Sequence, residues 1–288
     1  MRQPTETTMS EPGKPIEVRK IALALDCSTL NRLALETAVN LASATGAQLH
    51  AVFIEDECLY NLAAMPFARE VSFSGKRTRA FSTDHVAREI KRSVDAARIA
   101  VSAAARRARV HWEFDTTRGQ LDDALARVSG SAQILALGSS RSRIGRVHSV
   151  SALRASMHHG SGVVIAPPVA EFPGGPLVAI LSPGAELAVM VKTAERMASQ
   201  SGRSHRFLIV SDGAAERATL HQGLLETQAT TVEVAFCEIN TLSQVTRAVR
   251  LQSPGLVIAD IDYAHLDEAT STERVSEAFG APLLLIQV

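Results

Sequence analysis

The chain has 288 residues, which is enough for two domains of ordinary size, each with its own core. Basic and acidic residues both number 30, so the formal net charge is zero, which argues against nucleic acid as a main partner. The three cysteines form no C-x-x-C pair, which argues against a disulfide framework and favours the cytoplasm. No apolar run approaches the ~20 residues that span a membrane, so we expect a soluble protein without a membrane span.

The first half of the chain alternates strand-like and helix-like segments. Residues 1–18 carry three prolines among polar residues, so we expect a disordered N-terminal tail. Short apolar runs predict strands over 21–25, 48–54, 110–114, 133–138 and 162–166. Helical spacing of apolar residues predicts helices between them, over about 29–45, 83–109, 120–129 and 151–158. Strands that alternate with helices in this way predict a parallel, doubly wound α/β sheet.

A second unit of the same kind follows a stretch rich in proline and glycine. Pro167-Pro168 and Phe172-Pro-Gly-Gly-Pro176 are typical of a linker. Beyond the linker, strand-like and helix-like segments alternate again in the same order. We therefore expect a first domain over 19–168, a linker over 169–175 and a second domain over 176–288.

Several segments of the chain form a recognisable set. In the first half these are Lys20-Ile-Ala-Leu-Ala-Leu-Asp-Cys-Ser28, Ile134-Leu-Ala-Leu-Gly-Ser-Ser140 and Val163-Val-Ile-Ala166. In the second half they are the order of elements and Gly280-Ala-Pro-Leu-Leu-Leu-Ile286. Together these segments resemble the universal stress protein family. The resemblance implies two tandem five-stranded parallel sheets of order 3-2-1-4-5, the adenine-nucleotide alpha-hydrolase-like fold. It also implies a regulatory role in the stress response.

The resemblance further implies that the two units pair through their last strands. In a tandem chain both last strands belong to one molecule, so we expect residues 163–166 to run against residues 283–287. An unpaired edge strand at this position would invite aggregation. The arrangement is an intramolecular pseudo-dimer, and it leaves homodimerisation of the whole chain open.

The candidate ligand site lies where the strand order of the first half reverses. Open α/β sheets bind ligands at that point, beyond the carboxyl ends of the strands, where Asp26 and Gly138 follow the first and fourth strands. Some universal stress proteins bind ATP there, through an acidic residue after the first strand and a loop with Gly-x-x-Gly and a later Gly-Ser/Thr. In this chain Arg141 replaces the second glycine, and His148-Ser149 replaces the last pair.

Arginine and serine side chains in this loop offer hydrogen-bond donors to an anion in place of glycine backbone. We therefore predict a nucleotide or phosphate site with ATP or AMP as the candidate ligand, and the alternative is a solvated surface loop. Its candidate residues are Asp26, Cys27, Val52, Gly138, Ser139, Ser140, Arg141, Arg143, Ser149 and Ser151. Cys27 is either a redox-sensitive thiol or, as we expect, a small buried apolar residue.

The corresponding position in the second half is chemically different. Its first strand ends without an acidic residue, and its fourth strand ends at Asp260 and Asp262, whose carboxylates would repel a phosphate. We therefore expect a structural copy without a ligand. A metal site formed by these two residues and Asp267 is the disfavoured alternative.

Motifs for catalysis are missing from the sequence. There is no G-x-S-x-G, no complete G-x-x-x-x-G-K-S/T and no H-x-x-x-H spacing among the nine histidines. We therefore expect neither an enzyme nor a metal protein, and we name no catalytic residue.

Residues 55–82 form the most distinctive stretch, and we expect them to be irregular because Pro66 and Gly75 interrupt them. The favoured interpretation is that the apolar side chains pack under the sheet; these are Leu59, Leu62, Ala63 and Phe67. The alternative is an exposed binding face formed by Tyr60, Met65 and Phe67.

Two functions remain open at this point. The first is a regulatory protein that senses a nucleotide or another phosphate ligand through the first-half site. The second is a ligand-free adaptor that binds a partner protein through residues 55–80. Basic residues outnumber acidic ones between Arg69 and Arg109, which we interpret as a solvated helix face.

Overall fold

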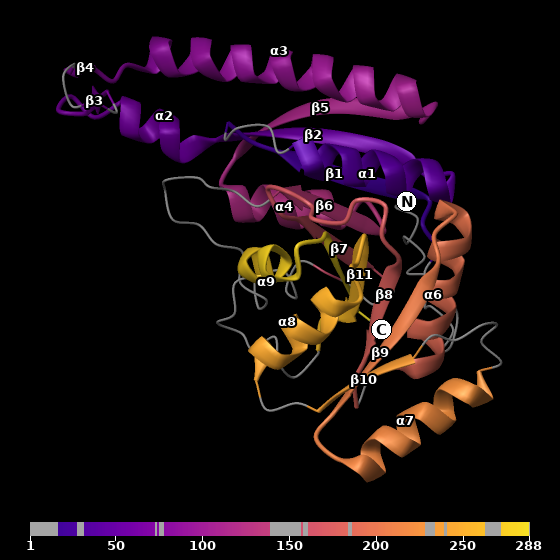
Figure 1. The fold of residues 1–288 in the computed structure, drawn as a ribbon. Coiled ribbons are helices and arrows are strands. Elements are labelled where there is room, and N and C mark those ends of the chain that lie inside the picture. The colour runs from indigo at the N-terminus through magenta and orange to yellow at the C-terminus, as the bar shows by residue number, and fades with distance from the viewer. Residues whose placement is uncertain are drawn as a thin grey trace, which may run out of the picture.

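The computed structural model describes residues 17–27, 32–72, 74, 78–138, 157, 161–183, 186–227, 234–238, 241–262 and 272–287. The main strands form one ten-stranded sheet in the order β10-β9-β8-β11-β12-β7-β6-β1-β2-β5 (Figure 1). The expected tail over residues 1–18 and the helix expected over 151–158 lie almost entirely outside the described residues. No helix in the described ranges is long and apolar enough to cross a membrane.

The first half contributes five parallel strands, as predicted. They are β1 (Lys20–Leu25), β2 (Gln48–Asp56), β5 (Trp112–Gly119), β6 (Ile134–Gly138) and β7 (Gly162–Ala166). Their order is β5-β2-β1-β6-β7, which is 3-2-1-4-5 when the five are numbered along the chain. β5 extends five residues beyond the expected end at Phe114, because it pairs with β2 as far as Asp56 opposite Gly119. The polar residues of this extension lie on the edge of the sheet, where apolar runs are not required.

The second half repeats this order. Its strands are β8 (Leu177–Leu181), β9 (His205–Ser211), β10 (Val234–Glu238), β11 (Leu256–Asp260) and β12 (Leu283–Ile286). All neighbours within the half are parallel, and the order β10-β9-β8-β11-β12 is again 3-2-1-4-5. The domain boundaries expected at 168 and 176 stay a prediction.

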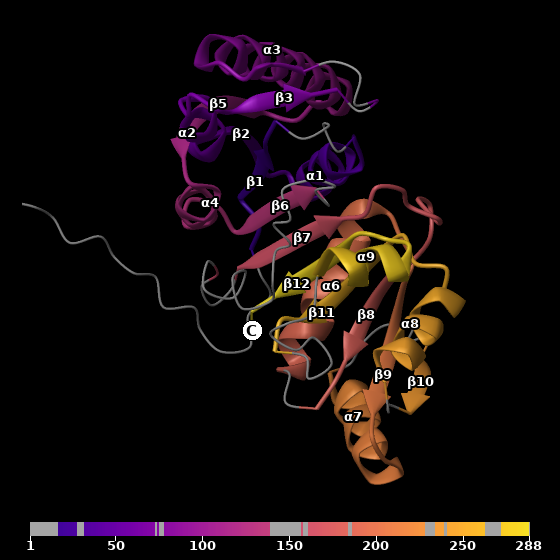
Figure 2. The same ribbon diagram turned by 90° about the vertical axis from the view of Figure 1, so that its left-hand side faces the viewer.

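The two halves meet at β7 and β12, which pair antiparallel with Ile165 opposite Leu283 and Gly162 opposite Ile286. This confirms the predicted pairing of the two last strands. The approach is close, since a Cβ at Gly162 would lie 3.0 Å from the carbonyl oxygen of Leu285. Because this one pair is antiparallel, the strands of the two halves run in opposite directions, and their carboxyl ends point to opposite sides of the sheet (Figure 2).

Helices cover both faces of the sheet. One face carries α1 (Arg32–Thr45), α3 (Thr83–Ala108), α6 (Leu187–Ser201) and α7 (Ala214–Glu226). The other carries α4 (Leu121–Ser129), α8 (Leu242–Leu251) and α9 (Thr272–Phe279). Each core runs without a break across both halves, because α1 packs against α6 and the strands alternate their side chains between the faces. The molecule is therefore one three-layer body (Figure 1).

Two arginines tie the expected linker to the second half. Arg203 donates to the carbonyl oxygens of Gly175 and Pro173, at 2.7 and 2.9 Å. Arg250 donates to both carboxylate oxygens of Glu171, at 2.8 and 2.6 Å. These contacts hold the stretch between β7 and β8 against the body.

The expectation of an irregular 55–82 segment is wrong. It contains the helix α2 (Glu57–Ala63) and a hairpin of β3 (Arg69–Val71) and β4 (Thr78–Ala80). The carboxylate of Asp56 accepts the backbone N–H of Cys58 at 2.9 Å and so caps α2. We call residues 55–80 the arm; it reaches beyond the sheet and lies beside the start of α3 (Figure 1).

Candidate functional site

The first-half site is built where β1 has β2 on one side and β6 on the other. The register sets Leu23 opposite Ala136, so the residues after Leu25 and after Leu137 emerge at the same edge. Asp26 and Cys27 follow β1 directly, and Gly138 ends β6. The sheet therefore brings together the two ends that the strand-order argument selects.

The described rim of this site is acidic. Burial, and after it the negative charges of Asp26, Glu55 and Asp56, together raise the pKa of the Cys27 thiol from 9.0 to about 12. Three carboxylates therefore lie close enough to one thiol to oppose its ionisation. Cys27 packs against the apolar core but is only half-buried, so it is less buried than the preferred interpretation expects. A thiol with so high a pKa is not a reactive thiolate at neutral pH.

A second group of side chains flanks this rim. Sequence analysis named only Tyr60 of this group, as part of an exposed binding face, and Tyr60 is half-buried instead. The Tyr60 hydroxyl donates to Glu55 Oε2 at 3.0 Å, and the Arg118 guanidinium carbon lies 3.6 Å from the centre of the Tyr60 ring. Burial and the bond to Glu55 raise the pKa of Tyr60. Glu55 and Arg118 are opposite each other in the β2–β5 ladder, but Arg118 lies beyond the strand end that was expected at Phe114, so no signal in the sequence indicated this pair.

Val52 does not contribute a side chain to the rim. It is buried in the core on the face that α4 covers, because side chains of β2 alternate between the two faces. The phosphate-loop candidates lie outside the described residues, and they stay a prediction; they are Ser139, Ser140, Arg141, Arg143, Ser149 and Ser151.

At the equivalent position of the second half, the described residues at the carboxyl ends of the strands include two buried polar side chains. Ser182 follows β8 and Asp260 ends β11, and both are buried. The carboxylate of Asp260 accepts the backbone N–H of Asp262 at 2.8 Å. The described residues contain no group of three side chains suited to hold a metal, and Asp267 lies outside them.

The arm carries a run of exposed apolar side chains. Phe67 is 77% exposed, and Leu62, Met65 and Val71 are exposed as well. Ala63 is buried and Leu59 packs against the core, as the packing interpretation expects. That interpretation is wrong for Leu62 and Phe67, because the short helix turns one face to the core and the chain then leaves the body at Pro66.

The strand order and the antiparallel pairing of β7 with β12 decide the fold. The chain has the fold of the tandem universal stress proteins. A universal stress protein of Archaeoglobus fulgidus DSM 4304 matches with a TM-score of 0.61 and 11% identity, over 92% of this chain and 98% of that chain. A Pseudomonas aeruginosa UCBPP-PA14 protein assigned to the universal stress proteins matches with a TM-score of 0.59 and 11% identity, over 94% and 93% of the two chains.

The fold of this chain also resembles a domain that belongs to a larger protein. The cytoplasmic domain of a prokaryotic cation chloride cotransporter matches with a TM-score of 0.52 and 13% identity, over 93% of this chain and 95% of that chain. No protein-family model matches the sequence, and a search of curated proteins gives no match. The likeness therefore lies in the fold, at sequence identities too low to carry over a ligand.

Proposed function

We propose that the chain is a regulatory protein, without enzymatic activity, that binds a partner protein through the arm. The observation that carries this proposal is the exposed apolar run on the arm, with Phe67 77% exposed. Exposed aromatic and methionine side chains that lie together are typical of protein interfaces. A chain of the same fold forms the cytoplasmic domain of a cotransporter, so the fold is compatible with contact to a larger protein.

Two further features agree with this proposal. The described part of the arm consists of a capped helix and a pair of strands, so these residues offer a partner an ordered surface. None of the three cysteines forms a disulfide, which suits a protein of the cytoplasm, and the stress response is the setting that the fold suggests.

Site-specific photocrosslinking tests the proposal. Benzoylphenylalanine replaces Phe67 in one variant and Phe236, an exposed aromatic residue on β10, in a control. In cells of the source organism we expect one discrete adduct at position 67, absent at position 236 and lost when Met65→Ser is added. Identical adducts at both positions, or none at position 67, would contradict a binding role for the arm.

A second candidate function is nucleotide sensing at the first-half site. The observation in its favour is the juxtaposition of Asp26 and Gly138 at the point where strand order reverses. A carboxylate at this position accepts hydrogen bonds from sugar hydroxyls, while Asp26, Glu55 and Asp56 repel phosphates from this side of the site. AMP, with its single phosphate, is therefore a better candidate than ATP.

Isothermal titration distinguishes this candidate. We expect AMP to release heat at submillimolar concentration, and Asp26→Asn to abolish it. Asp212→Asn is the matched control, because Asp212 is an exposed aspartate that follows a strand of the second half. An absence of heat with millimolar AMP and ATP would end the nucleotide hypothesis and leave the partner-binding proposal untouched.

A further inference from the structure

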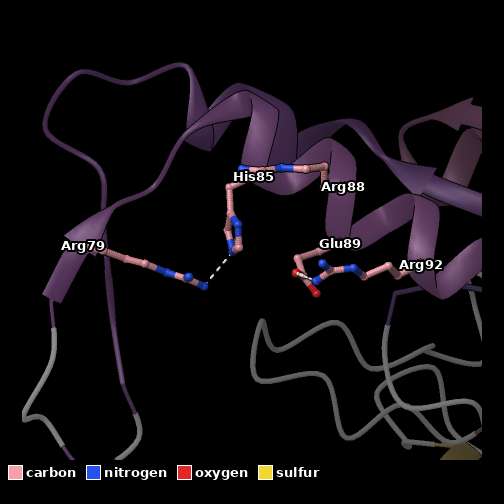
Figure 3. A pocket seen from close by; sticks show the side chains of 5 residues that line it. All are labelled: Arg79, His85, Arg88, Glu89 and Arg92. Atoms are coloured by element: carbon pink, nitrogen blue, oxygen red, sulfur yellow. Dashed lines mark hydrogen bonds and ion pairs between the residues drawn. The ribbon is translucent and has the colours of Figure 1, made fainter.

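A hollow of about 330 Å³ lies between the arm and the first three turns of α3. Arg79 of β4 lines one side, and His85, Arg88, Glu89 and Arg92 of α3 line the other (Figure 3). We call it the arginine hollow. Three guanidinium groups and one carboxylate make its lining electropositive, although the chain as a whole has no net charge.

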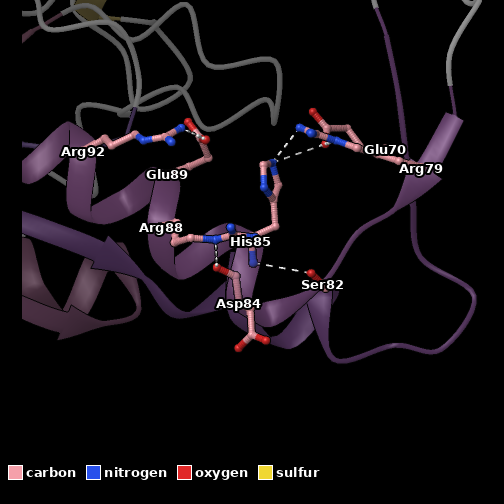
Figure 4. A network of polar contacts seen from close by, with 8 residues as sticks. All are labelled: Glu70, Arg79, Ser82, Asp84, His85, Arg88, Glu89 and Arg92. Atoms are coloured by element: carbon pink, nitrogen blue, oxygen red, sulfur yellow. Dashed lines mark hydrogen bonds and ion pairs between the residues drawn. The ribbon is translucent and has the colours of Figure 1, made fainter.

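The arginine on the hairpin is held in place by two partners (Figure 4). Arg79 Nε donates to Glu70 Oε2 at 2.6 Å, across the hairpin, and Arg79 Nη2 donates to His85 Nε2 at 2.6 Å. The Arg79 hydrogen bond lowers the pKa of Glu70, which keeps that carboxylate charged and the pair intact. Arg79 therefore tethers the hairpin to α3 and is oriented before any ligand arrives.

The guanidinium groups on α3 retain unused donors. Arg88 Nε donates to the carbonyl oxygen of Asp84 at 3.2 Å, and Arg88 has no carboxylate partner among the described residues. Arg92 pairs with Glu89 through Nη1 at 2.6 Å. A guanidinium has five N–H donors in a planar fork that matches a carboxylate. The Nη groups of Arg88 and the free edge of Arg92 can therefore receive an incoming carboxylate.

The positive charge continues beyond the hollow. Residues 69–109 contain eleven basic and four acidic side chains. The acidic ones include Glu70, which pairs with Arg79, and Glu89, which pairs with Arg92 beside the hollow (Figure 4). These carboxylates would repel the evenly spaced phosphates of a nucleic acid or a lipid surface. They are compatible with a peptide whose carboxylates enter one at a time.

We propose that the arginine hollow binds carboxylate side chains of an acidic segment of the partner protein. The size of the hollow suits one or two side chains rather than a flat membrane surface. The proposal rests on the proposed function, since it assigns a chemistry to the partner of the arm. The exposed apolar residues then supply contact area, and the hollow selects for charge.

Fluorescence anisotropy with fluorescein-labelled hexaglutamate tests this inference. At low ionic strength we expect saturable binding that weakens as sodium chloride is added. Arg88→Glu combined with Arg92→Glu should weaken it at least about tenfold. The matched control is Arg106→Glu with Arg107→Glu, which changes the net charge equally in the last turn of α3 and should weaken binding less than about twofold.

Three outcomes would overturn the inference. They are an absence of binding at 50 mM salt (about a 14 Å screening length), an equal loss in both double variants, and tighter binding to oligo-dT or to phosphatidylglycerol vesicles. Circular dichroism checks that both variants keep the wild-type helix content. If hexaglutamate does not bind while the crosslinked adduct at position 67 forms, only the inference about the arginine hollow is wrong. If hexaglutamate binds and no adduct forms, the hollow stands and the partner-binding function fails.

Discussion

The two halves share a strand order but differ at their carboxyl edges. In the first half Asp26, Glu55 and Asp56 surround a half-buried thiol beside an exposed arm. At the same position of the second half lie the buried residues Ser182 and Asp260, and the Asp260 carboxylate accepts a hydrogen bond from the backbone N–H of Asp262. One topology can therefore carry different residues at the carboxyl ends of its strands in the two copies, because a sheet constrains its core more than its loops.

The largest expected effect is at the seam, because both halves depend on it. Leu284 on β12 is fully buried and lies opposite Val164. Leu284→Ala should lower the free energy of unfolding by about 2–5 kcal/mol, since it leaves a cavity where the two halves meet. Urea denaturation followed by circular dichroism measures the loss. We expect one transition for the whole chain.

The control is Leu251→Ala, because Leu251 is exposed at the end of α8 and should cost less than about 0.5 kcal/mol. Two separate transitions, of which only one moves with Leu284→Ala, would show that the halves unfold independently. The two halves would then have to be compared as two independent domains rather than as two parts of one folding unit.

A smaller effect separates the structural aspartate from the exposed one. Asp260 is 6% exposed and accepts a backbone hydrogen bond, so Asp260→Ala should cost about 1–3 kcal/mol. Asp212→Ala should cost less than about 0.5 kcal/mol, because Asp212 is exposed. Thermal unfolding of the two variants measures the difference. Equal costs would mean that the buried Asp260 side chain does not contribute more to stability than the exposed Asp212 side chain.

The Cys27 thiol gives the first half a stability contribution that depends on pH. The folded state raises its pKa from 9.0 to about 12, so the folded chain keeps the proton over a range in which the unfolded chain loses it. The stability that this group contributes is therefore complete below pH 9 and declines as the pH rises from 9 towards 12. The difference in urea midpoint between wild type and Cys27→Ser, measured from pH 8 to pH 11, should follow that decline.

The same thiol reports on the acidic rim. Asp26→Asn removes one of the charges that raise its pKa, so Cys27 should be alkylated by iodoacetamide at lower pH than in the wild type. Cys58 is exposed and serves as the internal reference for alkylation. An unchanged alkylation profile would show that Asp26 does not contribute to the raised pKa of the Cys27 thiol.

The smallest expected effect is at the arm. Phe67→Ser should change the free energy of unfolding by less than about 0.5 kcal/mol, because the side chain is 77% exposed. Phe53→Ser is the matched control, and it should cost at least about 3 kcal/mol because Phe53 is almost completely buried. A large loss for Phe67→Ser would favour the packing interpretation and remove the main support for a binding arm.

Much of the fold was predictable from local pattern. Apolar runs such as Ile21–Leu25 and Leu177–Leu181 are strands buried on both faces, and such strands have a continuous apolar signature. The arm was not predictable in the same way. α2 has only seven residues, and β3 and β4 have three residues each, so none is long enough to show a period.

The candidate site was predictable only in part. Asp26 and Gly138 follow from the position of strand ends, which the sequence marks by the change from apolar to polar residues. The grouping of Glu55, Tyr60 and Arg118 was missed, because their proximity depends on the register between β2 and β5 and on the turn of α2. Register pairs residues that are more than 60 positions apart in the sequence.

The sequence by itself determined the alternation of strands and helices, the repetition of that order in two halves and the lack of net charge. These properties follow from amino-acid composition and from the spacing of apolar residues, which depend only on residues close together in the sequence. Only the tertiary structure decided that Phe67 faces solvent, that Arg79 joins Arg88 and Arg92 around one hollow, and that Asp260 is buried. Those outcomes depend on which distant elements meet, and that is settled by packing two sets of helices on one twisted sheet.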